Sequence, residues 1–187
     1  MLKLYETIDK LEADGKLNKE EFVYLLNNMS DSLSRYAIEK ARKKSLAYFG
    51  NRIYIRGLIE ISNYCKNDCY YCGIRKSNRN ARRYRLSKEE ILSCCRLGYD
   101  LGFRTFVLQG GEDPYFTDDI LSDIISEIKK RYPDCAVTLS LGERSRESYK
   151  RLFDAGADRY LLRHETANEA HYRKLHPENQ SLKNRKE

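Results

Sequence analysis

The chain has 187 residues, which is enough for one domain with a sizeable core. Its formal net charge is +7, and 34% of its residues are charged. No continuous apolar run approaches the roughly 20 residues that a membrane-spanning helix needs, and the charged N-terminus is unlike a signal peptide. We therefore expect a soluble, cytoplasmic protein without a membrane segment. The six cysteines are then better explained as metal ligands or buried thiols than as disulfides.

The first 50 residues are predicted to be helical. Asn18 and Glu21 form a cap-like start for a helix over residues 19–26, and Ser30 can cap a longer helix that ends near Phe49. We interpret residues 1–50 as an N-terminal helical segment that covers the domain after it.

From residue 53 onward, short apolar strands alternate with helical stretches, which is the pattern of βα units in a parallel sheet. The expected strands are 53–61, 105–109, 136–141 and 159–163. Three helices are expected after caps at Ser87 (with Glu90 in a capping box), Thr117 and Ser145, and a fourth helix is expected near residues 168–175. The predicted fold class is α/β, with about four βα units of a partial barrel over residues 51–187.

Four βα units are only part of a barrel, since eight units take about 250 residues. We therefore interpret residues 51–187 as the amino-terminal half of a barrel. If nothing covers it, the strand at 159–163 would be an exposed parallel edge. A chain of this kind is expected to be poorly stable alone and to associate through that edge.

Three cysteines, Cys65, Cys69 and Cys72, follow the first expected strand in a C-x3-C-x2-C run. Three thiolates are one too few for the four irons of a cubane cluster, so one iron would stay open to a small molecule. Two alternatives remain, a zinc knuckle with His164 as the fourth ligand and three unrelated buried thiols.

The cysteine spacing, with Tyr71 in the aromatic position before Cys72, resembles the radical S-adenosylmethionine (SAM) superfamily. Further motifs resemble, within it, the HydE family of FeFe-hydrogenase maturases over about residues 50–185. They are Cys72-Gly-Ile-Arg75, Arg83-Tyr-Arg85, Val107-Leu-Gln-Gly-Gly-Glu-Asp-Pro-Tyr115, Thr138-Leu-Ser-Leu-Gly-Glu143 and Arg159-Tyr-Leu-Leu-Arg-His-Glu-Thr-Ala-Asn168.

This resemblance implies an enzyme in which Cys65, Cys69 and Cys72 hold a 4Fe-4S cluster whose open iron binds SAM. An electron from the reduced cluster would cleave SAM to methionine and a 5′-deoxyadenosyl radical. The implied role is assembly of the diiron site of FeFe-hydrogenase from a small organometallic substrate. The implied partners are an electron donor such as ferredoxin or flavodoxin and other hydrogenase maturases.

The remaining candidate site residues lie where predicted strands end, the edge at which parallel α/β folds bind ligands. By the resemblance, the turn Gly110-Gly111-Glu112 receives the SAM amino group, Ser140 donates a hydrogen bond, and Glu165 contacts the ribose or sulfonium region. Arg185 would pair with the SAM carboxylate. The alternatives are a plain turn, a strand-end serine, a solvated acid paired with Arg163, and a disordered terminal arginine.

Other cysteines and histidines receive structural interpretations. Cys94, Cys95 and Cys135 are expected to be small core residues, and His171 and His176 are expected to be exposed. His164 is the one histidine near the expected site, where it would orient Glu165, contact substrate or serve the structure alone.

A basic stretch over residues 75–85 contains six cations with a tyrosine among them. This pattern could grip a nucleic-acid backbone, but we favour a solvated face or contact with an anionic substrate. The rival functions are a biotin-synthase-like or methylornithine-synthase-like enzyme, and an inactive cluster-binding fragment or electron carrier.

Overall fold

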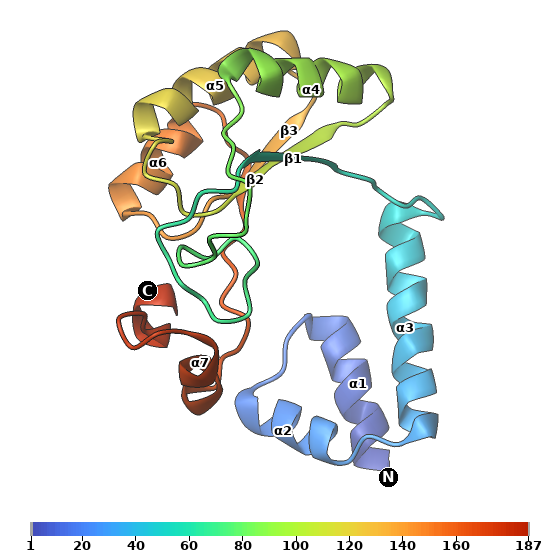
Figure 1. The fold of residues 1–187 in the computed structure, drawn as a ribbon. Helices are drawn as coiled ribbons and strands as arrows, with labels where there is room; N and C mark the ends of the chain where they lie inside the picture. The colour runs from blue at the N-terminus through green and yellow to red at the C-terminus, as the bar shows by residue number, and fades with distance from the viewer. Residues whose placement is uncertain (1, 187) are drawn as a thin grey trace. The chain divides into compact units, whose positions relative to one another are not determined.

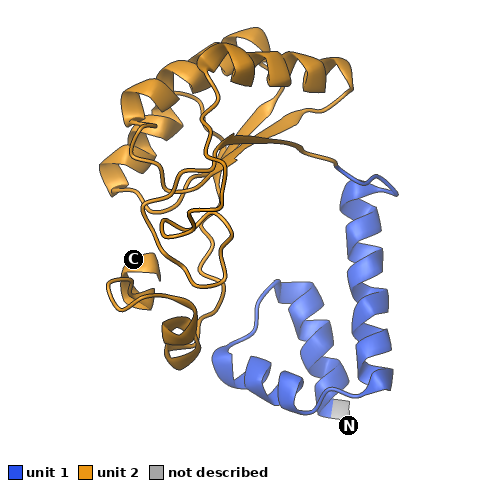
Figure 2. Ribbon diagram, in the orientation of Figure 1, with its two compact units in different colours: residues 1–54 blue, residues 55–187 orange. Residues whose placement is uncertain are grey.

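The computed structural model describes residues 2–186, and the chain forms two compact units, residues 1–54 and 55–187 (Figure 2). The first unit contains three helices, α1 (Leu2–Asp14), α2 (Lys19–Asn27) and α3 (Asp31–Phe49). The predicted caps of this unit are confirmed, because Asn18 and Glu21 form a reciprocal capping box and Ser30 accepts from the Leu33 amide. The division into two domains stays a prediction.

The first unit has its own small core of Leu4, Ile8, Leu25 and Leu33. Polar contacts join α1 to α3 beside this core. Tyr36 donates a 2.6 Å hydrogen bond to Asp9, and Lys40 Nζ lies 2.7 Å from Glu12 Oε2. Helix α3 ends at Phe49 and is capped by Gly50, whose φ of 61° favours glycine.

The second unit contains a parallel sheet whose strands follow one another in chain order (Figure 1). The strands are β1 (Gly57–Ser62), β2 (Thr105–Gly110), β3 (Ala136–Ser140) and β4 (Arg159–Tyr160). The α/β class and the parallel sheet are thus confirmed. Each strand is joined to the next by a crossover that contains a helix, the connection that parallel strands require.

The first and last predicted strands are each several residues longer than the observed ones, whereas the two middle strands differ by one residue. The first strand begins at Gly57 and not at residue 53, because its pairing with β2 starts with Gly57 opposite Phe106. Residues 53–56 have no paired residue on β2. The last strand ends at Tyr160 and not at residue 163, although the Leu161 amide still donates to the Leu139 carbonyl. An apolar sequence predicts a strand, but a neighbouring strand of matching length is needed to form one.

Helices α4 (Lys88–Asp100), α5 (Asp118–Arg131) and α6 (Arg146–Asp154) lie along one face of the sheet (Figure 1). Ile59 and Ile61 of β1 and Leu108 of β2 pack into the core on this face. The predicted caps Ser87, Thr117 and Ser145 all accept from a backbone amide three residues on. Asn168, which the sequence did not identify as a cap, does the same for the helix after it.

Two short helices follow the sheet, α7 (Glu169–Leu175), which the sequence predicted, and α8 (Leu182–Lys186), which it did not. The carboxyl ends of the strands therefore lead into the loops of residues 63–87, 111–117, 141–145 and 161–168. Among residues 2–186, no helix is both long and apolar enough to span a bilayer.

Candidate functional site

All ten of the predicted site residues line one cavity of about 210 Å³ at the carboxyl ends of the strands. They come from five separate segments of the chain, which the parallel sheet brings to the same edge. The ten are Cys65, Cys69, Tyr71, Cys72, Gly110, Gly111, Glu112, Ser140, Glu165 and Arg185.

The three cysteines lie on the loop after β1, and backbone hydrogen bonds hold this loop at both ends. The Lys66 amide donates to the Glu112 carbonyl at 2.9 Å, and the Tyr70 amide donates to the Leu175 carbonyl at 2.9 Å. The loop is therefore attached to the loop after β2 on one side and to the end of α7 on the other.

The Arg83 guanidinium holds the middle of the same loop. It donates to four backbone carbonyls, those of Asn63 (2.5 Å), Ile74 (2.8 Å), Arg75 (2.7 Å) and Asn78 (3.2 Å). One side chain thus joins the start of the loop to the segment that follows Cys72. In the sequence, Arg83 is visible only as part of a motif and of a basic stretch, and neither indicates that it binds the backbone of this loop.

The Gly-Gly turn after β2 fits closely against the cysteine loop. A Cβ atom on Gly111 would overlap the Tyr64 carbonyl and would lie 2.7 Å from Cys65 Cβ, and one on Gly110 would lie 3.0 Å from the Ser62 carbonyl oxygen. Both glycines line the cavity. The observed contacts also explain why Gly111 must be glycine, because there the two loops touch.

A buried carboxylate, Asp113, locks the same two loops together. It accepts 2.7 and 2.9 Å bonds from the Arg85 guanidinium and a 2.6 Å bond from the Ser62 hydroxyl. The guanidinium also stacks 4.0 Å from the ring centroid of Tyr64 and 4.9 Å from that of Tyr115. The sequence assigned no role to Asp113, although an acid directly after the Gly-Gly turn and an Arg-Tyr-Arg motif were visible.

Glu112 and Arg185 form an ion pair at the cavity wall. Arg185 Nη1 donates to Glu112 Oε1 at 3.1 Å, and its Nε lies 2.8 Å from Glu143 Oε1. Glu112 Oε2 lies 3.3 Å from Lys66 Nζ but has no hydrogen bond. This buried oxygen is available to a donor on a ligand.

Tyr71 contacts a buried histidine of the C-terminal helices. Its hydroxyl lies 3.4 Å from His176 Nε2, while His176 Nδ1 lies 3.0 Å from the Tyr172 carbonyl and its ring stacks on Tyr172. The prediction that His176 is exposed is therefore wrong, because the stacking and both hydrogen bonds bury it. Burial, with the nearby Cys69 and Glu165, raises the pKa of Tyr71. His171 is exposed as expected.

Glu165 has an unusual backbone. Its φ of 62° makes it the one non-glycine residue with positive φ in the described part of the chain, and the Thr166 amide donates across it to the His164 carbonyl at 2.7 Å. Such a tight turn is strained for a residue with a Cβ, and strain of this kind concentrates at functional sites. Ser140 ends β3 beside the cavity and is buried.

A polar row crosses the sheet face opposite to the helices. Arg163 donates to the Gln109 side-chain oxygen at 2.8 Å, and Gln109 donates to Glu60 at 3.2 Å. All three residues line the cavity. Arg163 is therefore bonded to Gln109, and the sequence did not identify Glu60 or Gln109 as site residues.

The three loop cysteines are free thiols of intermediate burial. Cys69 Sγ lies 3.4 Å from the Gln180 side-chain oxygen, and the Asn67 amide donates to Cys65 Sγ at 3.4 Å. Burial raises the pKa of the Cys69 thiol. Cys95 and Cys135 are buried as predicted, but Cys94 is exposed, because it lies one residue away from the apolar stripe of α4.

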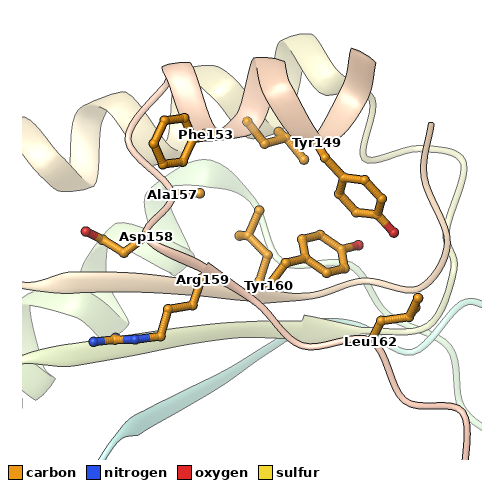
Figure 3. A pocket seen from close by; sticks show the side chains of 9 residues that line it. Tyr149, Phe153, Ala157, Asp158, Arg159, Tyr160 and Leu162 are labelled. Atoms are coloured by element: carbon orange, nitrogen blue, oxygen red, sulfur yellow. The ribbon is translucent and has the colours of Figure 1, made fainter. Parts of the chain in front are cut away.

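A second cavity, of about 390 Å³, lies between α6 and β4 (Figure 3). Apolar and aromatic side chains line most of it, including Tyr149, Phe153, Tyr160 and Leu162. It contains none of the residues that the sequence predicted for the site.

Comparison with known proteins identifies the family. Residues 59–187 match the model of the radical SAM superfamily. The chain belongs to the radical SAM superfamily. It is 46% identical over 182 residues to the [FeFe] hydrogenase maturase subunit HydE of Thermotoga maritima, an alignment that covers 97% of this chain and 50% of that protein.

Two solved structures of radical SAM proteins are similar in fold. HydG, a maturase of the [FeFe]-hydrogenase, superposes with a TM-score of 0.82 at 30% identity, over 94% of this chain and 40% of that one. Methylornithine synthase (PylB) superposes with a TM-score of 0.78 at 29% identity, over 96% and 53%. The chain spans about half the length of the curated relatives that it matches.

Radical SAM membership implies a 4Fe-4S cluster and SAM, and the residues at the cavity fit both. The loop offers three free thiols, the ligand number that leaves one iron open. Among residues 2–186, no three His, Cys, Asp or Glu side chains converge as they would around a single metal ion. In a cubane each cysteine binds a different iron, and His164 is not among the residues that line the cavity with the three cysteines.

Proposed function

We propose that this chain carries the cluster- and SAM-binding region of a radical SAM enzyme that takes part in FeFe-hydrogenase maturation. One observation carries the proposal: ten residues chosen from the sequence, on five segments, line a single cavity. Three sets of contacts fix the segments around it: the half-buried hydrogen bonds of Arg83, and the buried contacts of Asp113 and of the Glu112–Arg185 pair.

The bound cluster and SAM would supply the radical chemistry, by reductive cleavage of a carbon–sulfur bond. The chain supplies ligation, orientation and charge balance. Cys65, Cys69 and Cys72 would bind the irons as thiolates. At Cys69, the Gln180 amide would then turn its NH₂ group toward the sulfur, since a thiolate can only accept.

The other cavity residues would orient SAM. The unbonded Glu112 Oε2 and the turn at Gly110 and Gly111 are acceptors for its amino group. Arg185 keeps Glu112 as a partner, so only its remaining N–H groups can reach the SAM carboxylate. The tight turn at Glu165 holds the carboxylate at the cavity for the ribose or sulfonium region.

The likeness to HydE supports a role in assembly of the diiron site, with a small organometallic substrate, an electron donor and other maturases as partners in the cytoplasm. The structural likeness to methylornithine synthase makes that activity the second candidate. The polar row of Glu60, Gln109 and Arg163 would face either substrate.

Anaerobic reconstitution with iron and sulfide tests the proposal. We expect one 4Fe-4S cluster per chain, a changed cluster spectrum on addition of SAM, and 5′-deoxyadenosine among the products. Cys65→Ala, Cys69→Ala and Cys72→Ala should each abolish the cluster. Cys94→Ala is the matched control, since its thiol is exposed on α4. Equal loss in the control, or tight zinc binding without a cluster, would refute the proposal.

A further inference from the structure

The loop region of residues 63–86 is strongly basic, with seven cations and one acid. Some of these cations are hydrogen-bonded within the loop region, and others are exposed and have no such contact. Arg83 and Arg85 are bonded within the site, and Arg75 donates to the carbonyls of Tyr70 and Cys72. These three arginines are therefore structural.

Arg79 and Arg82 are different. Both are exposed, and within the described chain neither guanidinium has a hydrogen bond, ion pair or ring contact. Lys76 is exposed as well, and its ammonium group has no ion pair among these residues. The one acid, Asp68, is occupied by two hydrogen bonds from Ser77.

The three exposed cations, Lys76, Arg79 and Arg82, do not line the cavity, so they do not serve a ligand inside it. They are nevertheless fixed close to the cysteines. The Lys76 amide donates to the Asn67 carbonyl at 2.8 Å, and Asn78, next to Arg79, donates through its side chain to the Gly73 carbonyl at 2.7 Å. Asn67 and Gly73 are both within two residues of a predicted cluster ligand.

We propose that Lys76, Arg79 and Arg82 form a docking surface for an acidic electron-carrier protein that reduces the cluster on this loop. The inference rests on the proposed function, because a cluster that starts SAM cleavage needs one electron from outside. The carrier loses that electron and the cluster gains it. Electron transfer requires the two redox centres to come close, and this surface lies on the loop that carries the ligands.

The small number of exposed cations, three, favours a protein over a nucleic acid as the partner. Transient electron-transfer interfaces are small and depend on complementary charge for their association rate. A nucleic-acid site needs a longer row of cations with stacking aromatic rings. Here Arg83 and Arg85 are already bonded, and the hydroxyl of Tyr84 donates to the Glu60 carbonyl at 3.1 Å.

The test compares two double variants that each remove two exposed, unpaired cations. R79A/R82A changes the proposed surface, and R96A/K130A changes exposed positions on α4 and α5. Binding of an acidic flavodoxin is measured by calorimetry at low salt and at about 0.5 M salt. We expect R79A/R82A to weaken binding about 5- to 30-fold at low salt and the control to change it less than 2-fold. The difference should shrink at high salt.

Equal weakening in both double variants, or none in R79A/R82A, would overturn the proposal. So would mixed tRNA that binds more tightly than flavodoxin and is lost in R79A/R82A, which would indicate a nucleic-acid surface. Iron content and SAM binding are measured first. Failure of the unaltered chain to take up a cluster counts against the proposed function, whereas flavodoxin binding is measured with or without iron and tests the surface itself.

Discussion

Glu112 Oε1 lies 3.1 Å from Arg185 Nη1, and each side chain is only 8% exposed. The pair joins the loop after β2 to α8, across 73 residues of sequence. Removal of one partner leaves the other buried charge with a single, more exposed partner, Glu143 for Arg185 or Lys66 for Glu112. Glu112→Gln or Arg185→Met should therefore each lower the free energy of unfolding by about 1–3 kcal/mol. The double variant should lose less than the sum, because it leaves neither charge behind. Urea unfolding at neutral pH measures this, and strictly additive losses would contradict it.

Gly111→Ala should prevent cluster uptake, because the new Cβ would overlap the Tyr64 carbonyl and press on Cys65. Gly73→Ala is the matched control on the same loop, since a Cβ there meets nothing within 4 Å. Iron analysis and visible absorbance after anaerobic reconstitution would distinguish them. Normal cluster content in Gly111→Ala would show that the two loops can separate without losing the site.

Glu165→Ala should weaken SAM binding about 10- to 150-fold, the effect of losing a charge-assisted hydrogen bond worth about 1.5–3 kcal/mol, while the cluster is retained. Glu165→Gly should weaken SAM binding to the same extent but raise the free energy of unfolding, since glycine adopts a φ of 62° without strain. SAM titration and thermal unfolding provide the two readouts. A glycine variant with unchanged stability would mean that the turn is unstrained.

Asp113 should make stability depend on acid pH. Burial acts to raise the pKa of this carboxyl, but hydrogen bonds from Arg85 and Ser62 outweigh it, so the pKa is lowered. Because the pKa is lower in the folded state, the ionised carboxylate stabilises the fold at any pH above the unfolded-state pKa of about 3.9. This stabilisation is lost as the pH falls through the folded-state pKa. Asp113→Asn should therefore lower the free energy of unfolding by about 1.5–3 kcal/mol at pH 7. This gap between the unaltered chain and the variant should close as the pH falls below about 4.

Urea midpoints at pH 7, 5, 4 and 3 would follow this gap. Asp123→Asn is the control, because its ion pair with Lys88 is solvent-exposed and should contribute little at any pH. A gap for Asp113→Asn that stays constant or widens toward pH 3 would rule out the linkage.

The sequence predicted the features that depend on local chemistry or on chain order. Caps such as Ser87 with Glu90 need only three residues to form, and the strand-end rule brought Cys65 and Glu165 to one cavity although 100 residues separate them. The interior of the site was not predictable in this way. The partners of Arg185 and the burial of His176 depend on how α7 and α8 pack, and no periodic pattern encodes that packing.

The four backbone carbonyls that Arg83 binds have a consequence for how a cluster enters this loop and is replaced there. A loop whose shape is already fixed by a guanidinium loses little conformational entropy when metal enters. Oxygen destroys exposed clusters, but here the loss of iron and sulfide would leave the cysteine loop in its folded conformation. A chain emptied by brief exposure to air could then be reloaded without refolding, so repair would be limited by the supply of iron and sulfide.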